Sequence, residues 1–476
     1  MRKGYMTAFL TLSLTLILAL VFTVIEGARI SAIRMKFECV TDIGMNSVLA
    51  EYHRELLEQY DLLFVDASYG GGQPAIANTE AHLQHYIQQN LTTENTGGFF
   101  PVVDFLAMNT EQVTISQYSI ASDDGGGVLK RQVTDYMADY PVGAALSVLD
   151  GWSGQIGQLA QRNIAAERES YQAQIEAIGL PEQEVEEGVM EKVPLNNPAD
   201  IANATRSSGV LNLVLDDTTQ LSKVRIATEE YISHRECRRG TGICKEAVDL
   251  TGDVNELIFQ TYLFEKCGYY GEELDKSLLK YQIEYILKGK DTDWQNLEAV
   301  AKQLLAWREV ANVIYILSDG AKMAEAEALA MTLAAVTLMP ELLVPVKYTI
   351  LFAWAYVESL QDVRILLRGG RVPIYKTAAD WKTDIHSILN VKGSLTDEAG
   401  EGNGLSYKEY LQVMLFLENA GNRTYRAMDI MEMDIRQTPG NGTFCLDGCF
   451  DTYQARIAVN SRFGYRYEMT RQYGFY

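Results

Sequence analysis

An uncharged apolar run near the N-terminus constrains this chain more than any other feature. Residues 5–25 (YMTAFLTLSLTLILALVFTVI) hold 21 positions without a charged side chain. At about 1.5 Å per residue, a helix of this length measures about 31 Å, which matches the hydrocarbon core of a bilayer. The run therefore predicts a transmembrane helix that contacts membrane lipid through residues 5–25.

Basic residues stand on both sides of the run, at Arg2 and Lys3 before it and at Arg29, Arg34 and Lys36 after it. A tail of four residues that carries two positive charges is the usual geometry of a signal anchor. We therefore expect a single-pass protein of the cell membrane. Residues 1–4 form a cytoplasmic tip, and residues 26–476 form an extracytoplasmic domain.

The alternative is a secretory signal that is removed. Signal peptidase requires small residues one and three positions before the cut. A cut after Ala28 places Glu26 at the third position, and a cut after Gly27 places Ile25 there. Both sites are poor, which favours a retained helix.

A second apolar region covers residues 321–367 and resembles more membrane. Its longest uncharged stretch, residues 328–340, has only 13 positions, and Glu341 and Lys347 follow it. A membrane span needs about 20 residues, and charges at mid-depth are costly. We expect buried helices of a soluble core here.

The rest of the chain predicts an α+β domain with a small sheet, strands near both ends and a helix-rich middle. Apolar residues recur at helical spacing up to residue 60, so the anchor helix is expected to continue to about Gln59. Strands are expected at residues 62–65, 113–120 and 210–215, and a terminal hairpin at residues 453–459 and 465–469. Helices are expected at residues 128–140, 144–178, 254–287, 294–317, 323–338, 345–367, 381–389 and 407–419.

Two segments mark the organisation of this domain. Residues 181–208 are acidic and then contain Asn and Pro, which is typical of a linker, and residues 235–437 form a candidate helical subdomain. Ser406 and Glu409 have the spacing of a capping box that opens the helix at 407–419, and Gly421 is expected to close it.

The six cysteines suggest two local disulfides in an extracytoplasmic protein, Cys237 with Cys244 and Cys445 with Cys449. Each would close a turn. The alternative for the first pair is a metal site that uses His234 as well. The six-residue gap between Cys237 and Cys244 does not match the short cysteine spacing of zinc sites.

The net charge of −22 and the isoelectric point near 4.7 exclude a nucleic-acid partner, because phosphate contacts require a basic surface. No phosphate-binding glycine loop, nucleophile elbow or zinc-protease motif occurs in the sequence. His82 and His85 are only two metal ligands, and residues 123–127 form an acidic turn with too few oxygens for calcium. Residues 398–409 fail as an EF-hand loop because Gly400 and Gly402 would occupy ligand positions.

We therefore expect no catalytic residue, no cofactor, no metal and no small-molecule substrate. The chain is interpreted as a non-enzymatic protein.

Several segments resemble an uncharacterised family of single-pass membrane proteins of Gram-positive bacteria, found with Tad-type (tight adherence) pilus genes. The N-terminus itself is similar to the TadE or pseudopilin type. The resemblance rests on residues 3–10 (KGYMTAFL), 25–29 (IEGAR), 38–47 (ECVTDIGMNS), 51–57 (EYHRELL), 61–66 (DLLFVD), 353–359 (AWAYVES) and 471–474 (RQYG).

The resemblance implies a structural, assembly or accessory role beside other pilus, pseudopilin or secretion-system proteins. It also implies a processing site between Gly4 and Tyr5. The fifth residue after that cut is Phe9, where the prepilin pattern has a glutamate. Two other classes stay open: a surface binding protein or adhesin that uses the same anchor without pili, and an extracytoplasmic enzyme of unknown reaction.

Overall fold

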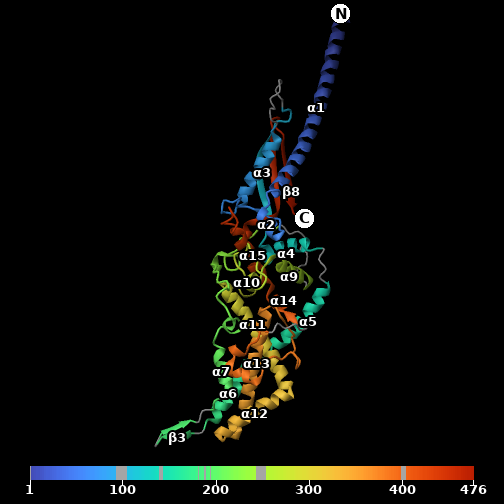
Figure 1. Ribbon diagram of the computed structural model, residues 1–476. Coiled ribbons are helices and arrows are strands. Elements are labelled where there is room, and N and C mark those ends of the chain that lie inside the picture. Colours follow the sequence, from blue (N-terminus) through green and yellow to red (C-terminus); the bar gives the residue numbers. More distant parts are fainter. Residues whose placement is uncertain are drawn as a thin grey trace. The chain divides into compact units, whose positions relative to one another are not determined.

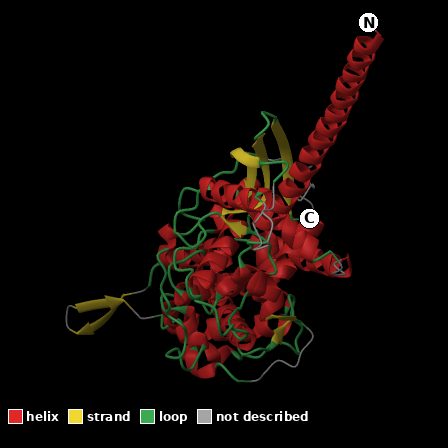
Figure 2. Cartoon of the chain, turned by 90° about the horizontal axis from the view of Figure 1, so that it is seen from above, coloured by secondary structure: helices red, strands yellow, loops and turns green. Residues whose placement is uncertain are grey.

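The computed structural model describes residues 2–92, 104–138, 143–180, 182–186, 189–192, 195–242, 253–397 and 404–475. The chain forms two compact units, each assembled from segments that are distant in sequence. Unit 1 comprises residues 1–136, 236–250 and 431–476, and unit 2 comprises residues 137–235 and 251–430. Helices make up most of the chain (Figure 2). The main sheet belongs to unit 1, and the combination confirms the α+β class.

The sheet of unit 1 is antiparallel, with β7 (Cys449–Ser461) at its centre. β7 pairs with β2 (Met108–Ile120), with β8 (Arg466–Gly474) and with the two-residue β1 (Val65–Asp66). The strand expected at residues 113–120 and the terminal hairpin are therefore confirmed.

The strand expected at residues 62–65 is wrong except at Val65. The backbone of Leu63 bonds to the side chain of Gln132 instead of a strand, through its N–H (2.8 Å) and its carbonyl (2.7 Å). Gln132 lies on α4 (Asp123–Tyr136), which begins with a left-handed turn over the acidic segment.

Helices α1 (Arg2–Leu49) and α3 (Ile76–Leu91) pack on one face of this sheet (Figure 1). The core between them contains alternate residues of β7, namely Tyr453, Ala455, Ile457 and Val459. From α1 it contains Ile33, Phe37, Val40, Met45 and Val48, and from α3 it contains Leu83, Ile87 and Leu91. Steps of mostly three or four residues along both helices place these side chains on one stripe.

The anchor helix does not continue to Gln59 as expected. α1 ends at Leu49, and a separate helix, α2 (Arg54–Tyr60), follows. His53 separates the two, because its extended backbone donates to the Phe64 carbonyl (2.8 Å) and its ring accepts from the N–H of Leu56 (3.2 Å). The apolar spacing is continuous across this point, so only these contacts reveal the break.

Unit 2 is mainly helical. Its helices are α5 (Gly143–Ala160), α6 (Ile164–Ile178), α7 (Pro198–Thr205), α8 (Val210–Val214), α9 (Asp253–Lys266), α10 (Gln282–Lys288), α11 (Asp293–Ser318), α12 (Gly320–Thr337), α13 (Leu343–Leu367) and α14 (Tyr407–Leu417). α15 (Ala420–Arg436) begins in unit 2 and ends in unit 1. Unit 2 also contains two short antiparallel strand pairs. β3 (Glu182–Glu186) pairs with β4 (Val189–Lys192), and β5 (Arg371–Val372) pairs with β6 (Leu405–Ser406).

Helix α13 is the buried centre of unit 2. Every side chain from Thr349 to Leu367 is buried, and α11 and α12 pack against it. This confirms the expected buried core helix for α13, whereas α12 is buried only at Ala326, Ala330, Ala334 and Thr337 and exposes Met331 (51%) and Val336 (65%). Glu358 and Asp362, the two acids within the buried length of α13, are paired inside the unit, as described below.

The strand expected at residues 210–215 is wrong, because this segment forms helix α8. The carboxylate of Glu298 accepts from the N–H groups of Val210 (2.8 Å) and Leu211 (3.0 Å). These are first-turn donors that a helix leaves without partners, so a distant acid on α11 stabilises the helical form.

Three expected helices are shorter or tighter than the apolar pattern suggested. Residues 144–178 divide into α5 and α6 at Asn163, whose side chain accepts from the N–H of Ala166 (3.1 Å). Residues 254–287 divide into α9 and α10 around an irregular segment. Residues 381–389 contain a 3₁₀ helix (Ile385–Asn390) that begins at the capping residue Asp384.

The expected capping box is confirmed: the N–H of Glu409 donates to Ser406 Oγ (3.3 Å), and Glu409 accepts from the N–H of Ser406 (2.6 Å). Gly421 does not close α14, which ends at Leu417, but lies in the first turn of α15.

Two further expectations concern the positions of the helical subdomain and of the linker. Unit 2 begins at Met137, upstream of the expected start near residue 235, and residues 181–208 carry β3, β4 and α7.

Candidate functional site

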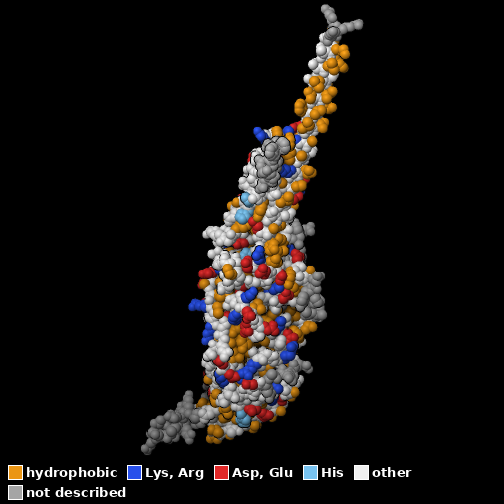
Figure 3. Space-filling model, turned by 45° about the horizontal axis from the view of Figure 1, so that its top comes forward, with side chains coloured by type: hydrophobic (Ala, Val, Ile, Leu, Met, Phe, Trp, Pro, Cys, Tyr) orange, Lys and Arg blue, Asp and Glu red, His pale blue; other side chains and the backbone are white. Residues whose placement is uncertain are grey.

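The N-terminal half of α1 is an exposed apolar helix. Its most apolar stretch has a mean hydropathy of 2.6, and 0% of that stretch is buried. Among the helices in the described part of the chain, α1 is the one that is long and apolar enough to cross a membrane. Tyr5 is 82% exposed and Phe22 is 65% exposed. Hydrophobic side chains cover this projecting end (Figure 3).

The threonine hydroxyls of this exposed half form hydrogen bonds within the helix. The hydroxyls of Thr7, Thr11 and Thr23 donate to backbone carbonyls three or four residues earlier, at 2.8–3.0 Å. A hydroxyl bonded in this way leaves no free donor toward hydrocarbon. The threonines are therefore compatible with a membrane span.

The C-terminal half of α1 is held on the sheet by three tyrosine hydroxyls from β7, β8 and the turn between them. Tyr465 donates to Glu26 (2.6 Å), Tyr473 donates to Asp42 (2.8 Å), and Tyr453 donates to the Met45 carbonyl (2.9 Å). Burial raises the pKa of Tyr453, which keeps its phenol protonated as a donor. These bonds add to the packing of the buried stripe.

Helix α3 supports α1 from a second side. A Cβ at Gly44 would lie 3.0 Å from Ile87, so the glycine permits close approach of the two helices. Lys36 donates to the Leu91 carbonyl (2.7 Å). Glu51, just after α1, accepts from Tyr86 (2.7 Å), and this bond is the main cause that raises the pKa of Tyr86.

Gly4 and Tyr5, the residues of the expected processing site, lie in the first turns of α1. A Cβ added at Gly4 would meet nothing within 4 Å, so the backbone there is open on that side. Whether cleavage occurs stays a prediction.

The two histidines considered as metal ligands have structural contacts. His82 lies 3.0 Å from Glu51, and its ring stacks on Tyr69 at 3.9 Å between centroids. The ring of His85 lies 6.1 Å from that of Tyr86.

The expected Cys237–Cys244 disulfide falls partly outside the described residues, because Cys244 is not among them. Cys445 and Cys449 are free thiols in the structure, so the expected bond between them is not formed there. The Cys449 thiol donates to the Cys445 carbonyl (3.4 Å), and burial raises its pKa well above the usual range.

Glu432, Cys445 and Asp447 lie close enough together to suggest a metal site. Arginines already satisfy them: Arg436 lies 3.3 Å from Glu432 and 3.6 Å from the Cys445 sulfur. Asp447 accepts from the N–H and guanidinium of Arg238, at 3.0 and 3.2 Å. We assign this cluster to structural ion pairing.

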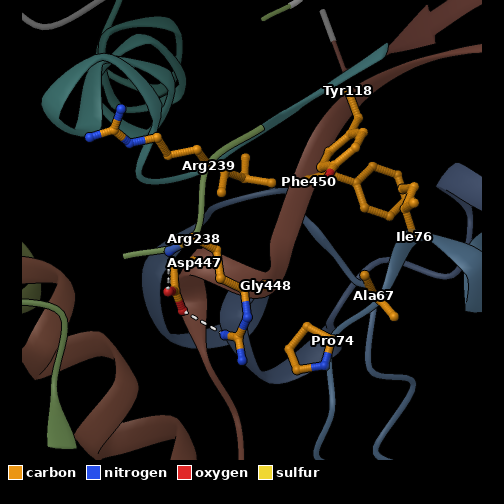
Figure 4. A pocket seen from close by; sticks show the side chains of 11 residues that line it. Ala67, Pro74, Ile76, Tyr118, Arg238, Arg239, Asp447, Gly448 and Phe450 are labelled. Atoms are coloured by element: carbon orange, nitrogen blue, oxygen red, sulfur yellow. Dashed lines mark hydrogen bonds and ion pairs between the residues drawn. The ribbon is translucent and has the colours of Figure 1, made fainter. Parts of the chain in front are cut away.

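A hollow of about 70 Å³ lies beside this cluster in unit 1. Figure 4 shows Arg238 joined to Asp447 on one side, with Pro74, Ala67 and Ile76 around the rest. Metabolite sites in proteins measure about 300–1,000 Å³. At about 70 Å³ the hollow is well below that range.

Unit 2 contains a buried network of four charges that sequence analysis missed. Arg308 on α11 donates to Asp362 on α13 (2.9 Å), and Lys376 contacts both Asp362 (2.5 Å) and Glu358. All four side chains are at most 2% exposed. Although burial opposes ionisation, Lys376 and Arg308 lower the pKa of Asp362. The signal in the sequence was two acids four residues apart within an apolar helix.

Another buried acid of unit 2 is Glu284 on α10. One carboxylate oxygen accepts from Tyr407 (2.7 Å) and from the N–H of Tyr270 (3.0 Å). The other oxygen has no hydrogen-bond partner among the described residues. Burial raises the pKa of Glu284 to about 7.

Comparison with known proteins gives one family match. No curated protein and no solved structure matches the chain. The family model covers residues 188–461, which is more than half of the chain, and leaves α1 outside. The chain therefore belongs to the Family of unknown function (DUF5702).

Proposed function

We propose that this protein is a non-enzymatic, membrane-anchored structural, assembly or accessory component of a Tad-like pilus or secretion apparatus. One observation carries the proposal: α1 is a single helix whose first half is exposed and apolar and whose second half is locked to the sheet. Such a helix holds unit 1 at a fixed distance from the membrane. The similarity of residues 3–10 to a pseudopilin N-terminus supports the pilus context.

In this proposal residues 1–4 lie in the cytoplasm and the bulk of the chain lies outside. Arg2 and Lys3 support this orientation through the charge preference of signal anchors. Besides membrane lipid, the proposed partners are pilus, pseudopilin or secretion-system proteins that contact the anchor or the domain.

The anchor is tested by placing two charges in the middle of the span. We expect the variant Leu14→Arg with Leu18→Arg to leave the membrane fraction, because each arginine is costly in hydrocarbon. The measurement is the share of full-length protein that stays in the membrane pellet after an alkaline carbonate wash. The matched control, Leu14→Ile with Leu18→Ile, is expected to stay in the pellet, and release of the unmodified protein would contradict the anchor.

The mature N-terminus separates the roles within this proposal. Mass spectrometry of membrane and sheared surface fractions would identify it. A chain that starts at Tyr5 supports pseudopilin-type processing, and an intact Met1 confined to membranes supports a permanent accessory anchor. A start beyond Gly27 contradicts a retained anchor.

The pilus context is tested by crosslinking in intact cells, followed by purification from solubilised membranes. We expect pilus or secretion-system proteins to be recovered with the full chain. Recovery of none of them, together with unaffected pilus assembly after deletion, would favour the adhesin alternative.

A further inference from the structure

The turn between β7 and β8 lies beside α1 at the end of the uncharged run. Tyr465 in this turn donates to Glu26 (2.6 Å), the first charged residue after the run. The guanidinium of Arg29 lies 3.9 Å from the ring centroid of Phe463 and also pairs with Glu26 (2.8 Å). The turn is therefore level with the point where α1 would leave a bilayer.

A second turn, which precedes β2, is joined to the first one. Ser461 Oγ donates to the Leu106 carbonyl (3.1 Å), and the N–H of Arg462 donates to the Ala107 carbonyl (2.9 Å). Asp104 closes this second turn by accepting from the N–H groups of Leu106 and Ala107. Residues 104–107 and 461–465 together form what we call the rim.

The rim exposes two large aromatic side chains. Phe105 is 71% exposed and Phe463 is 45% exposed, whereas the sheet residues behind them are buried. Arg462, between Ser461 and Phe463, is also exposed. Exposed aromatic residues beside basic ones are the composition that proteins place in the headgroup region of a membrane.

The length of α1 places the rim in that layer. Residues 5–25 fill about 31 Å of hydrocarbon, and Arg29 lies only about 5 Å further along the helix axis than Glu26. The headgroup region on each side of the core is roughly 5–7 Å thick. Phe463 and Tyr465, which contact Arg29 and Glu26, therefore fall within it.

We propose that the rim is a second membrane contact, in which Phe105 and Phe463 enter the headgroup layer of the bilayer that α1 spans. The inference rests on the proposed anchoring of α1. Because the rim contacts the membrane to one side of α1, the two contacts together fix the tilt of unit 1 relative to the membrane. A helix alone would leave the domain free to lean.

The test introduces one tryptophan at a time into the full chain, as Phe463→Trp and Phe105→Trp, and reconstitutes each variant in phosphatidylcholine–phosphatidylglycerol vesicles. The added emission is obtained by subtracting the unsubstituted protein, whose five tryptophans all belong to unit 2. We expect lipids brominated near the headgroup to remove most of the added emission at both positions. The matched control is Tyr52→Trp, an exposed position just past the C-terminal end of α1, where the added emission should persist.

The outcomes separate this inference from the anchor. If the unsubstituted protein floats with vesicles after a carbonate wash but both rim tryptophans keep their emission, α1 is an anchor and the rim contact is wrong. Such a result would favour a protein, in place of lipid, as the partner that contacts the rim. If the unsubstituted protein washes off the vesicles, both proposals are overturned.

Discussion

Replacing Asp362 by Ala is expected to lower the free energy of unfolding of unit 2 by about 3–5 kcal/mol. Asp362 is fully buried and pairs with Arg308 and Lys376, which are also buried. The variant leaves two positive charges with only Glu358 to balance them. A buried charge without a partner keeps its desolvation cost and loses the attraction that offset it.

Urea unfolding of the full chain in detergent measures this effect. All five tryptophans lie in unit 2, so tryptophan fluorescence reports that unit; they are Trp152, Trp294, Trp307, Trp354 and Trp381. The control Asp275→Ala removes an exposed acid and should change stability by no more than about 0.5 kcal/mol. A similarly small loss for Asp362→Ala would mean that water reaches the network.

Replacing Glu284 by Gln is expected to stabilise unit 2 by about 3 kcal/mol at pH values above 7. Burial, the main cause, raises the pKa of Glu284 from 4.5 to about 7. The folded chain therefore binds the proton more tightly than the unfolded chain does. Glutamine resembles the protonated acid and carries no charge to bury.

The sign of the pH dependence follows from this raised pKa. The contribution of Glu284 to the stability of the folded state is fully present below about pH 4.5 and is lost as the pH rises to about 7. The stability difference between Glu284→Gln and the unsubstituted protein should grow from near zero to its full size across this window. Urea titrations at several pH values test it, with the exposed Glu325→Gln as control. A difference that does not vary with pH would show that Glu284 is not buried as a carboxyl.

Local patterns in the sequence predicted some elements well. The terminal hairpin follows from alternation of apolar and polar residues, and the capping box at Ser406 follows from a spacing of three. In both, the residues that decide the structure are neighbours in the chain or across a single turn. The same holds for the apolar run of α1, whose length and lack of charge do not depend on any distant residue.

Elements that depend on distant partners could not be predicted in this way. The segment from Val210 has strand-like composition, yet Glu298 on α11 supplies acceptors that favour a helix. α1 ends before His53 because the backbone of His53 bonds to Phe64. No local pattern contains these bonds, because they appear only when the chain has folded.

The same distinction between local patterns and distant contacts applies to the candidate site. The sequence by itself determined that residues 5–25 can span a bilayer, because transfer to hydrocarbon depends on composition and length alone. Only the tertiary structure decided how the helix is held, through Tyr453, Tyr465 and Tyr473. It also decided that the rim and the buried charges of unit 2 exist, since burial and pairing are properties of contacts between residues far apart in the chain.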